Sequence, residues 1–98
     1  RHKIVEMIQR VNACYAFLDI LVWRFHRGET PVAELAMMKV QATTTLEFVA
    51  RESLQVLGGR AYTGDNRVER IYREARIFVI GGGSEEILRD LAGRQLGF

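Results

Sequence analysis

Hydrophobic residues recur through the first quarter of the chain at alternating steps of four and three positions. They form one apolar stripe, made of Ile4, Ile8, Val11, Tyr15, Leu18, Val22 and Phe25. Because a helix completes a turn in about 3.6 residues, this spacing predicts a long helix with the stripe along one face. The apolar surface extends beyond the stripe through Val5, Leu21 and Trp23, so we expect this helix to contact more than one neighbour. Arg27 and Gly28 end it, since glycine readily adopts the left-handed conformation found after helix C-termini.

A second long helix is predicted after a short connection. Thr30 can accept a backbone N–H as the N-cap, and Pro31 suits the first helical position because its missing donor is not needed there. The apolar positions again follow the helical period, and they are Leu35, Met38, Ala42, Leu46, Val49, Val56 and Leu57. Threonine hydroxyls can bond to carbonyls one turn earlier, so we expect the helix to continue through residues 43–45. Gly58 and Gly59 end it.

Two shorter helices are predicted in the second half of the chain. Turn-forming residues 63–66 precede the first of them, over residues 68–77, and residues 78–80 fit either an extended segment or a helix. The glycines at 81–83 break whatever precedes them. Ser84 is placed to cap a last helix, whose first turn carries two glutamates that suit the positive end of the helix dipole.

These four helices predict an all-α fold in a single domain over residues 1–98. Two long helices joined by a short connection must pack antiparallel, and the two shorter helices complete an up-and-down bundle. No internal repeat is present. The first residue is Arg1, and apolar positions begin almost at once, so we expect the chain to be a fragment of a longer one.

Composition excludes several classes of function. Fourteen Lys and Arg against twelve Asp and Glu leave a net charge of +2, which is too balanced for a nucleic-acid-binding surface. The single Cys14 excludes an intramolecular disulfide, and neither His2 nor His26 has neighbours at metal-ligand spacing. The longest apolar run, near residues 15–23, is interrupted by Asp19 and falls short of the ~20 residues that a membrane span needs. We therefore expect no nucleic acid, metal or membrane span.

Three motifs follow one another in the second half, at residues 55–63, 67–76 and 81–87. Together they resemble the C-terminal helical domain of acyl-CoA dehydrogenases, which use FAD to oxidise the α,β carbon–carbon bond of acyl-CoA thioesters. The resemblance covers nearly the whole chain but only the final part of a family member. It implies part of an FAD-dependent enzyme that acts on acyl-CoA, assembles as a homodimer or homotetramer, and works in the cytoplasm or the mitochondrial matrix. The isolated chain is expected to be inactive.

The glycine run and Ser84 expose backbone N–H groups at a helix N-terminus, an arrangement suited to anions such as phosphates. A plain turn and helix cap is the alternative. The resemblance implies that Gly83 contacts the substrate, and that Ser84, Glu85 and Glu86 contact FAD.

The commonest family pattern carries a catalytic glutamate where this chain has Gly82, which has no group that could accept a proton. The resemblance leaves two readings. In one, the base lies on an earlier helix, as in isovaleryl- and long-chain acyl-CoA dehydrogenases. In the other, the protein is a family member that does no dehydrogenation.

The motif that begins at Gln55 resembles the segment that reaches the FAD of a neighbouring subunit, which implies cofactor contacts for Gln55, Gly58 and Gly59. Glycines permit close backbone approach to a ligand. A helix C-cap would explain Gly58 and Gly59 without any ligand, and both roles can hold at once.

Arginines recur at every third residue of the second motif, at Arg67, Arg70, Arg73 and Arg76. A phosphate or nucleic-acid surface is one reading. We favour a salt-bridged structural helix, because Glu69 is spaced to pair with Arg73 and Glu74 with Arg70.

Two other functions stay open from the sequence. One is a non-catalytic helical module that keeps the family's shape and oligomerises, which Gly82 and the short length favour. The other is a different flavoenzyme on the same scaffold, such as an acyl-CoA oxidase, a nitroalkane oxidase or a flavin-dependent hydroxylase.

Overall fold

The computed structural model describes all 98 residues, which form helices and no strand, so the all-α prediction is confirmed. The helices are α1 (His2–His26), α2 (Val32–Leu57), α3 (Gly59–Thr63), α4 (Arg67–Ile80) and α5 (Glu85–Leu96). The two long and two shorter helices match those expected, and residues 78–80 belong to α4. The five-residue α3 was not predicted, because Gly59 opens it and glycine usually interrupts helices.

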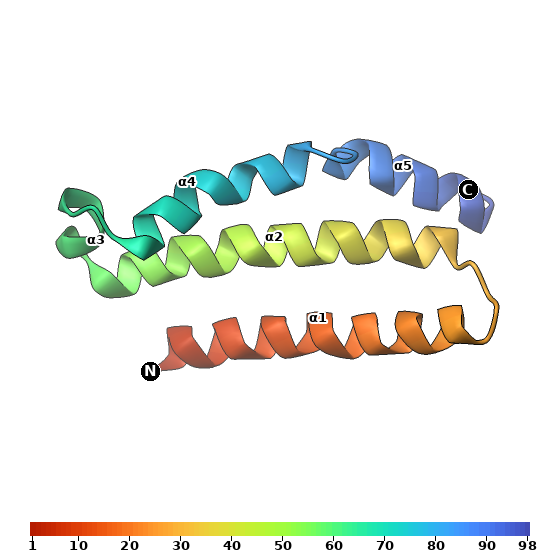
Figure 1. The fold of residues 1–98 in the computed structure, drawn as a ribbon, viewed down its shortest axis with the longest axis horizontal. Coiled ribbons are helices and arrows are strands. Elements are labelled where there is room, and N and C mark those ends of the chain that lie inside the picture. Colours follow the sequence, from red (N-terminus) through yellow and green to blue (C-terminus); the bar gives the residue numbers. More distant parts are fainter.

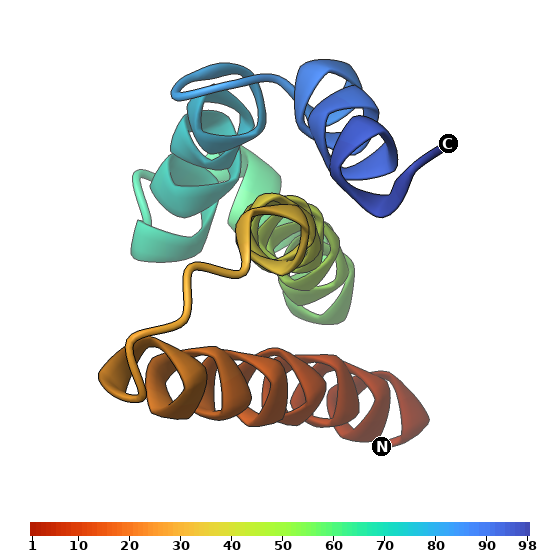
Figure 2. The same ribbon diagram turned by 90° about the vertical axis from the view of Figure 1, so that its right-hand side faces the viewer.

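The long helix α2 lies at the centre of the fold. Figure 1 shows α1 running antiparallel to it on one side, while α4 and α5 follow one another along its other side. The end-on view in Figure 2 shows the same three layers, with α2 between α1 and the α4–α5 layer. Every other helix packs against α2. No helix is both long enough and apolar enough to cross a membrane.

The turn between α1 and α2 ends as predicted for α1, but α2 starts at a different residue from the one predicted. Gly28 adopts a left-handed φ of 83°, as expected. The N-cap of α2, however, is Pro31 and not Thr30, and no side chain caps this end. Pro31 has a ψ of 77°, outside the helical region, so the helix begins one residue later than expected and the Thr30 hydroxyl has no capping role. The Thr30 carbonyl instead accepts the N–H of Val32 at 2.9 Å.

Arg24 joins the two ends of this turn. Its Nη1 lies 2.7 Å from a Glu34 carboxylate oxygen on α2, and its Nε lies 3.4 Å from Glu29 in the connection. The hydrogen bond from Arg24 holds the pKa of the Glu34 carboxyl below its ordinary value. The pair therefore favours the folded state while Glu34 is ionised.

Glu34→Gln should lower the thermal unfolding midpoint at neutral pH but not in acid. Because the folded-state pKa is depressed, the stabilisation is present above the ordinary value of about 4.5 and is lost as the pH falls through the folded-state value. Circular-dichroism melts of both chains between neutral and acidic pH measure this. Asp90→Asn, which breaks an exposed pair with Arg94 within α5, is the control and should matter less. A Glu34→Gln deficit that stays constant into acid would contradict the expectation.

Only 12 of the 98 residues are buried, and α2 supplies half of them. Many are alanines, which let helices approach closely. Ala33 and Ala36 of α2 meet Ala92 of α5 in one small cluster, with Leu88 and Leu91 packed against it. The small alanine side chains therefore allow α2 and α5 to pack closely together.

The apolar stripe of α1 is not buried against α2. Its side chains Ile4, Tyr15 and Phe25 are 47%, 62% and 65% exposed, and Leu21, which lies outside the stripe, is the one buried residue of α1. The residues of α1 that contact α2 form the neighbouring row, shifted by one position. This row includes Lys3, Met7, Arg10, Cys14, Leu21 and Arg24. Within the chain α1 packs principally on α2, so a second neighbour would come from outside it.

The stripe borders an apolar groove between α1 and α2. One hollow of about 270 Å³ is lined by Val11, Cys14, Tyr15, Leu18, Met38, Ala42, Thr45, Leu46 and Val49. A second hollow of about 360 Å³ near the start of α1 shares Val11 and Val49 with it. The groove thus follows the helix pair over several turns, and nothing in the chain covers it.

Candidate functional site

The connection between α4 and α5 forms a tight turn over residues 81–84, here called the glycine turn. Gly82 and Gly83 have φ values of +72° and +104°. The positive φ of Gly83 favours glycine, and a Cβ there would lie 3.0 Å from a Leu88 methyl carbon, which would have to shift to make room for it. The N–H groups of Gly82, Gly83 and Ser84 donate no hydrogen bond within the chain. The turn can therefore offer these donors to a ligand.

Ser84 caps α5 as predicted, because its Oγ accepts the N–H of Ile87 at 3.4 Å. Glu85 pairs with Arg89 one turn later. The pKa of Glu86 is held below its ordinary value, first by its own backbone N–H and then by the Ser84 hydroxyl, with Arg76 and Arg89 adding to the effect. The Glu86 carboxylate is thus stabilised in its ionised form at the helix end, and the Glu85 carboxylate is engaged by Arg89.

Lys39 of α2 reaches the glycine turn from the other side. Its Nζ donates to the Gly83 carbonyl at 2.7 Å. The sequence pattern missed this residue, because 44 positions separate the two partners. The only local signal is that Lys39 lies between the buried Met38 and Val40, where a charged side chain is unusual.

The end of α2 carries the second set of predicted residues. Gln55, Gly58 and Gly59 lie together beside a hollow of about 690 Å³ between α2, α3 and α4. The hollow is also lined by Arg51, Leu54, Ala61, Tyr62, Glu69, Tyr72 and Arg73. Guanidinium groups match phosphate oxygens in geometry, and phenol rings present flat apolar faces. The hollow therefore has the chemistry for a ligand that combines phosphates with an aromatic ring.

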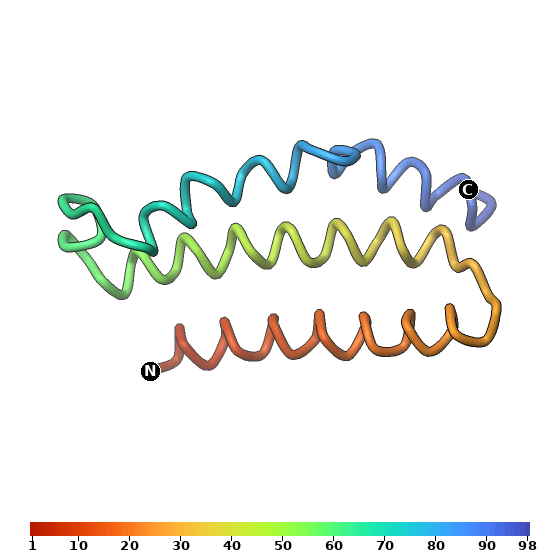
Figure 3. Tube along the Cα trace, viewed as in Figure 1, coloured from red at the N-terminus to blue at the C-terminus, as the bar shows by residue number.

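The glycine turn and the Gln55 segment lie at opposite ends of α4, as the backbone trace in Figure 3 shows. The helix has 14 residues, which corresponds to about 21 Å along its axis. One chain therefore offers two separate contact regions. They cannot both touch the same small group of a ligand.

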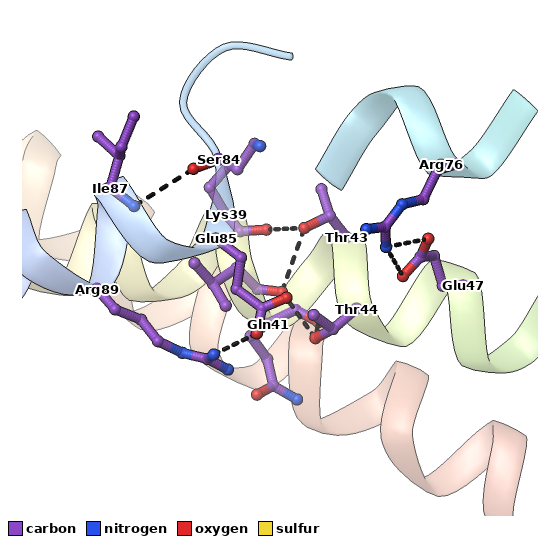
Figure 4. A network of polar contacts seen from close by, with 11 residues as sticks. Lys39, Gln41, Thr43, Thr44, Glu47, Arg76, Ser84, Glu85, Ile87 and Arg89 are labelled. Carbon is purple, nitrogen blue, oxygen red and sulfur yellow. Dashed lines mark hydrogen bonds and ion pairs between the residues drawn. The ribbon is translucent and has the colours of Figure 1, made fainter. Parts of the chain in front are cut away.

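The arginine motif forms a salt-bridged helix. Arg73 pairs with Glu69, as expected. The expected pair of Arg70 with Glu74 does not form, and its orientation, with the acid C-terminal to the base, is the less favourable one on a helix. Arg76 instead reaches across to Glu47 of α2 at 3.0 Å (Figure 4). No group of three or more His, Cys, Asp or Glu residues lies close enough to hold a metal ion.

Comparison with known proteins gives a consistent result. A model of the C-terminal domain of acyl-CoA dehydrogenase matches residues 1–97. The chain is 37% identical to acyl-CoA dehydrogenase AFT10-1 of Alternaria alternata, over 94% of this chain and 24% of that protein. It is 33% identical to the probable acyl-CoA dehydrogenase YdiO of Escherichia coli K12, over 98% of this chain and 25% of that protein. The crystal structure of a putative acyl-CoA dehydrogenase from Mycobacterium smegmatis superposes with a TM-score of 0.94 at 38% identity, covering 99% of this chain and 26% of that one.

Proposed function

Because the chain belongs to the acyl-CoA dehydrogenase family, as its C-terminal domain, we propose that it forms the end of an FAD-dependent enzyme that oxidises the α,β bond of acyl-CoA thioesters. The chain spans about a quarter of the length of the curated relatives that it matches. The activity is therefore proposed for a longer parent protein. The isolated chain is expected to have none.

The glycine turn is the observation that carries the proposal. Its three unbonded N–H groups and the absence of a Cβ at Gly83 let a ligand approach the backbone closely. In this proposal Gly83 lies against the acyl thioester, while Ser84, Glu85 and Glu86 lie against FAD. When bound, FAD supplies the acceptor for the hydride that leaves the β-carbon.

The hollow at the end of α2 fits the second cofactor contact. Gln55, Gly58 and Gly59 border it, and a Cβ on either glycine would meet nothing within 4 Å, so the backbone there is open to a ligand. Arg51 and Arg73 place guanidinium groups on its wall, where Arg73 is paired with Glu69 and Arg51 with Glu52. We propose that this region binds the FAD of a neighbouring subunit, because the glycine turn lies at the other end of α4.

The catalytic base is proposed to lie on a helix upstream of Arg1. Gly82 offers no proton acceptor, and the nearby Glu85 and Glu86 are engaged by Arg89 and by the helix end. This is the isovaleryl-like arrangement. The absence of a carboxylate at Gly82 also favours the second candidate, a family member that binds flavin or oligomerises without dehydrogenating acyl-CoA.

The exposed stripe of α1 supports a homo-oligomer, a dimer or a tetramer, with this domain at its centre. Six of the seven stripe side chains are at least 42% exposed in the single chain, and an exposed apolar face of this kind is typical of an interaction surface. We propose a cytoplasmic location, or the mitochondrial matrix if the source is a eukaryote.

The longer parent protein is expected to be purified with FAD, and anaerobic addition of a saturated acyl-CoA should bleach the flavin absorbance. The matching enoyl-CoA, which has no hydride to give, is the control and should leave the flavin oxidised. A parent that holds flavin but is reduced by no acyl-CoA of any chain length would contradict the dehydrogenase function. Oxygen uptake with a nitroalkane would then identify a nitroalkane oxidase, whereas oxygen uptake with an acyl-CoA that does reduce the flavin would identify an acyl-CoA oxidase. If the parent protein binds no flavin, the non-catalytic oligomerisation module is the function that remains.

A further inference from the structure

The glycine turn is held to the rest of the fold by few bonds. The Gly81 N–H bonds to Ile77 of α4 at 2.7 Å, and the Ser84 carbonyl accepts the N–H of Leu88 at 3.0 Å. Both of these bonds are local to α4 or α5. The hydrogen bond from Lys39 is the one that comes from a distant part of the chain.

The ammonium of Lys39 has no carboxylate partner. No Asp or Glu oxygen lies within 4.0 Å of it, whereas the other lysine, Lys3, is paired with Glu52. Lys39 is partly buried. A charged donor bonds a carbonyl more strongly than a neutral one. The only hydrogen-bond acceptor of the Lys39 side chain in the chain is the carbonyl of Gly83.

This bond fixes the orientation of the next peptide unit. A trans peptide is planar, and its C=O and N–H point in opposite directions. Because the Gly83 carbonyl is directed toward Lys39 on α2, the Ser84 N–H is directed away from α2. That N–H has no partner within the chain. Leu88 lies close to the turn, because a Cβ added at Gly83 would meet its side chain at 3.0 Å.

We propose that Lys39 is a positioning residue for the glycine turn: its ammonium holds the Gly83 carbonyl, and the shared peptide plane thereby aims the Ser84 N–H outward as a donor to the bound flavin or thioester. The inference rests on the proposed function, which supplies the acceptor for that N–H. Lys39 itself need not touch either ligand. Its effect passes through one rigid peptide unit.

The test uses the longer parent protein with Lys39→Met, which keeps the length of the side chain and removes its donors. The control is Lys3→Met, which removes the pair with Glu52 between α1 and α2, away from the turn. The first readout is amide hydrogen exchange without substrate. The Ile87 and Leu88 amides bond to Ser84. We expect them to exchange about tenfold faster in Lys39→Met than in the unmodified protein, and at the unmodified rate in Lys3→Met.

The second readout is catalysis. We expect Lys39→Met to keep its flavin, to show an altered flavin absorbance band, and to lose about tenfold or more in kcat with a smaller change in KM. Lys39→Arg, which keeps a charged donor, should recover part of the loss.

Unchanged exchange at Ile87 and Leu88 in Lys39→Met would overturn the proposal whatever the activity. Faster exchange with normal kcat and flavin spectrum would overturn the link to function. If the unmodified parent holds no flavin or reduces it with no acyl-CoA, the proposed function fails instead. The exchange experiment then still decides whether Lys39 orients the turn.

Discussion

Gly83→Ala in the longer parent protein is expected to lower kcat/KM for acyl-CoA about a hundredfold and to lower the thermal midpoint as well. At a φ of +104° an alanine is strained, and its Cβ would lie 3.0 Å from Leu88. Backbone strain of this kind costs about 1–3 kcal/mol where the fold tolerates it. The turn will relieve the strain by moving, which displaces the neighbouring Ser84 N–H. Steady-state kinetics and a thermal melt of the same preparation measure both effects.

Gly93→Ala is the matched control for this substitution. Gly93 lies inside α5, and a Cβ there would meet nothing within 4 Å. Alanine in a helix interior is more favourable than glycine by about 0.5–1 kcal/mol, so Gly93→Ala should raise the thermal midpoint and leave kcat/KM unchanged. Equal changes in kcat/KM and in the thermal midpoint for Gly83→Ala and Gly93→Ala would contradict the role assigned to Gly83.

Leu21→Ala should destabilise the 98-residue chain by about 2–5 kcal/mol, the cost of emptying a filled site in a packed interior. Leu21 is 2% exposed and is the largest fully buried side chain. A domain of this size is stable by only about 5–15 kcal/mol, so the loss is a large share of the total. Urea unfolding monitored by circular dichroism gives the free energies.

Leu18→Ala on the same helix removes the same atoms from a side chain that is 42% exposed. In the isolated chain it should cost less than about 1 kcal/mol. In the assembled parent the cost should rise, because a neighbour is proposed to cover the stripe there. Equal costs for Leu21→Ala and Leu18→Ala in the isolated chain would contradict the packing of α1.

The sequence pattern predicted the helices well, because their ends depend on local signals. Gly28 and Ser84 act through their own backbone and immediate neighbours, and both behave as expected. Pro31 also acts locally, but the position of a proline does not distinguish the N-cap from the first helical residue. The misassignment of Thr30 followed from that ambiguity.

The face of α1 that packs on α2 could not be read from hydrophobicity. The packed row contains Lys3, Arg10 and Arg24, whose stems and charges are accommodated by contacts with α2. Arg10 lies 3.7 Å from the centroid of the Phe48 ring, for example. The more apolar stripe lies beside this row and stays exposed in the single chain.

At the candidate site, the local glycine motifs could be predicted from the sequence. The residues from distant segments that contact these motifs could not. The geometry at Gly83 follows from neighbouring residues, whereas the bond from Lys39 depends on how α2 and α5 are docked. The same holds for Arg73, which joins Gln55 at the hollow only because α2 and α4 lie side by side. Contacts between distant segments leave no periodic trace in a sequence.

The alanine cluster between α2 and α5 has a consequence for protein engineering. Ala36 and Ala92 are packed against Leu88, and Leu88 lies so close to Gly83 that a Cβ added there would meet it. A larger residue in the cluster would push α5 outward and move Gly83 with it, because a packed interior has little free volume to absorb the change. Mutant libraries intended to change ligand preference should therefore leave these alanines fixed, since a variant there would alter the turn without contacting any ligand.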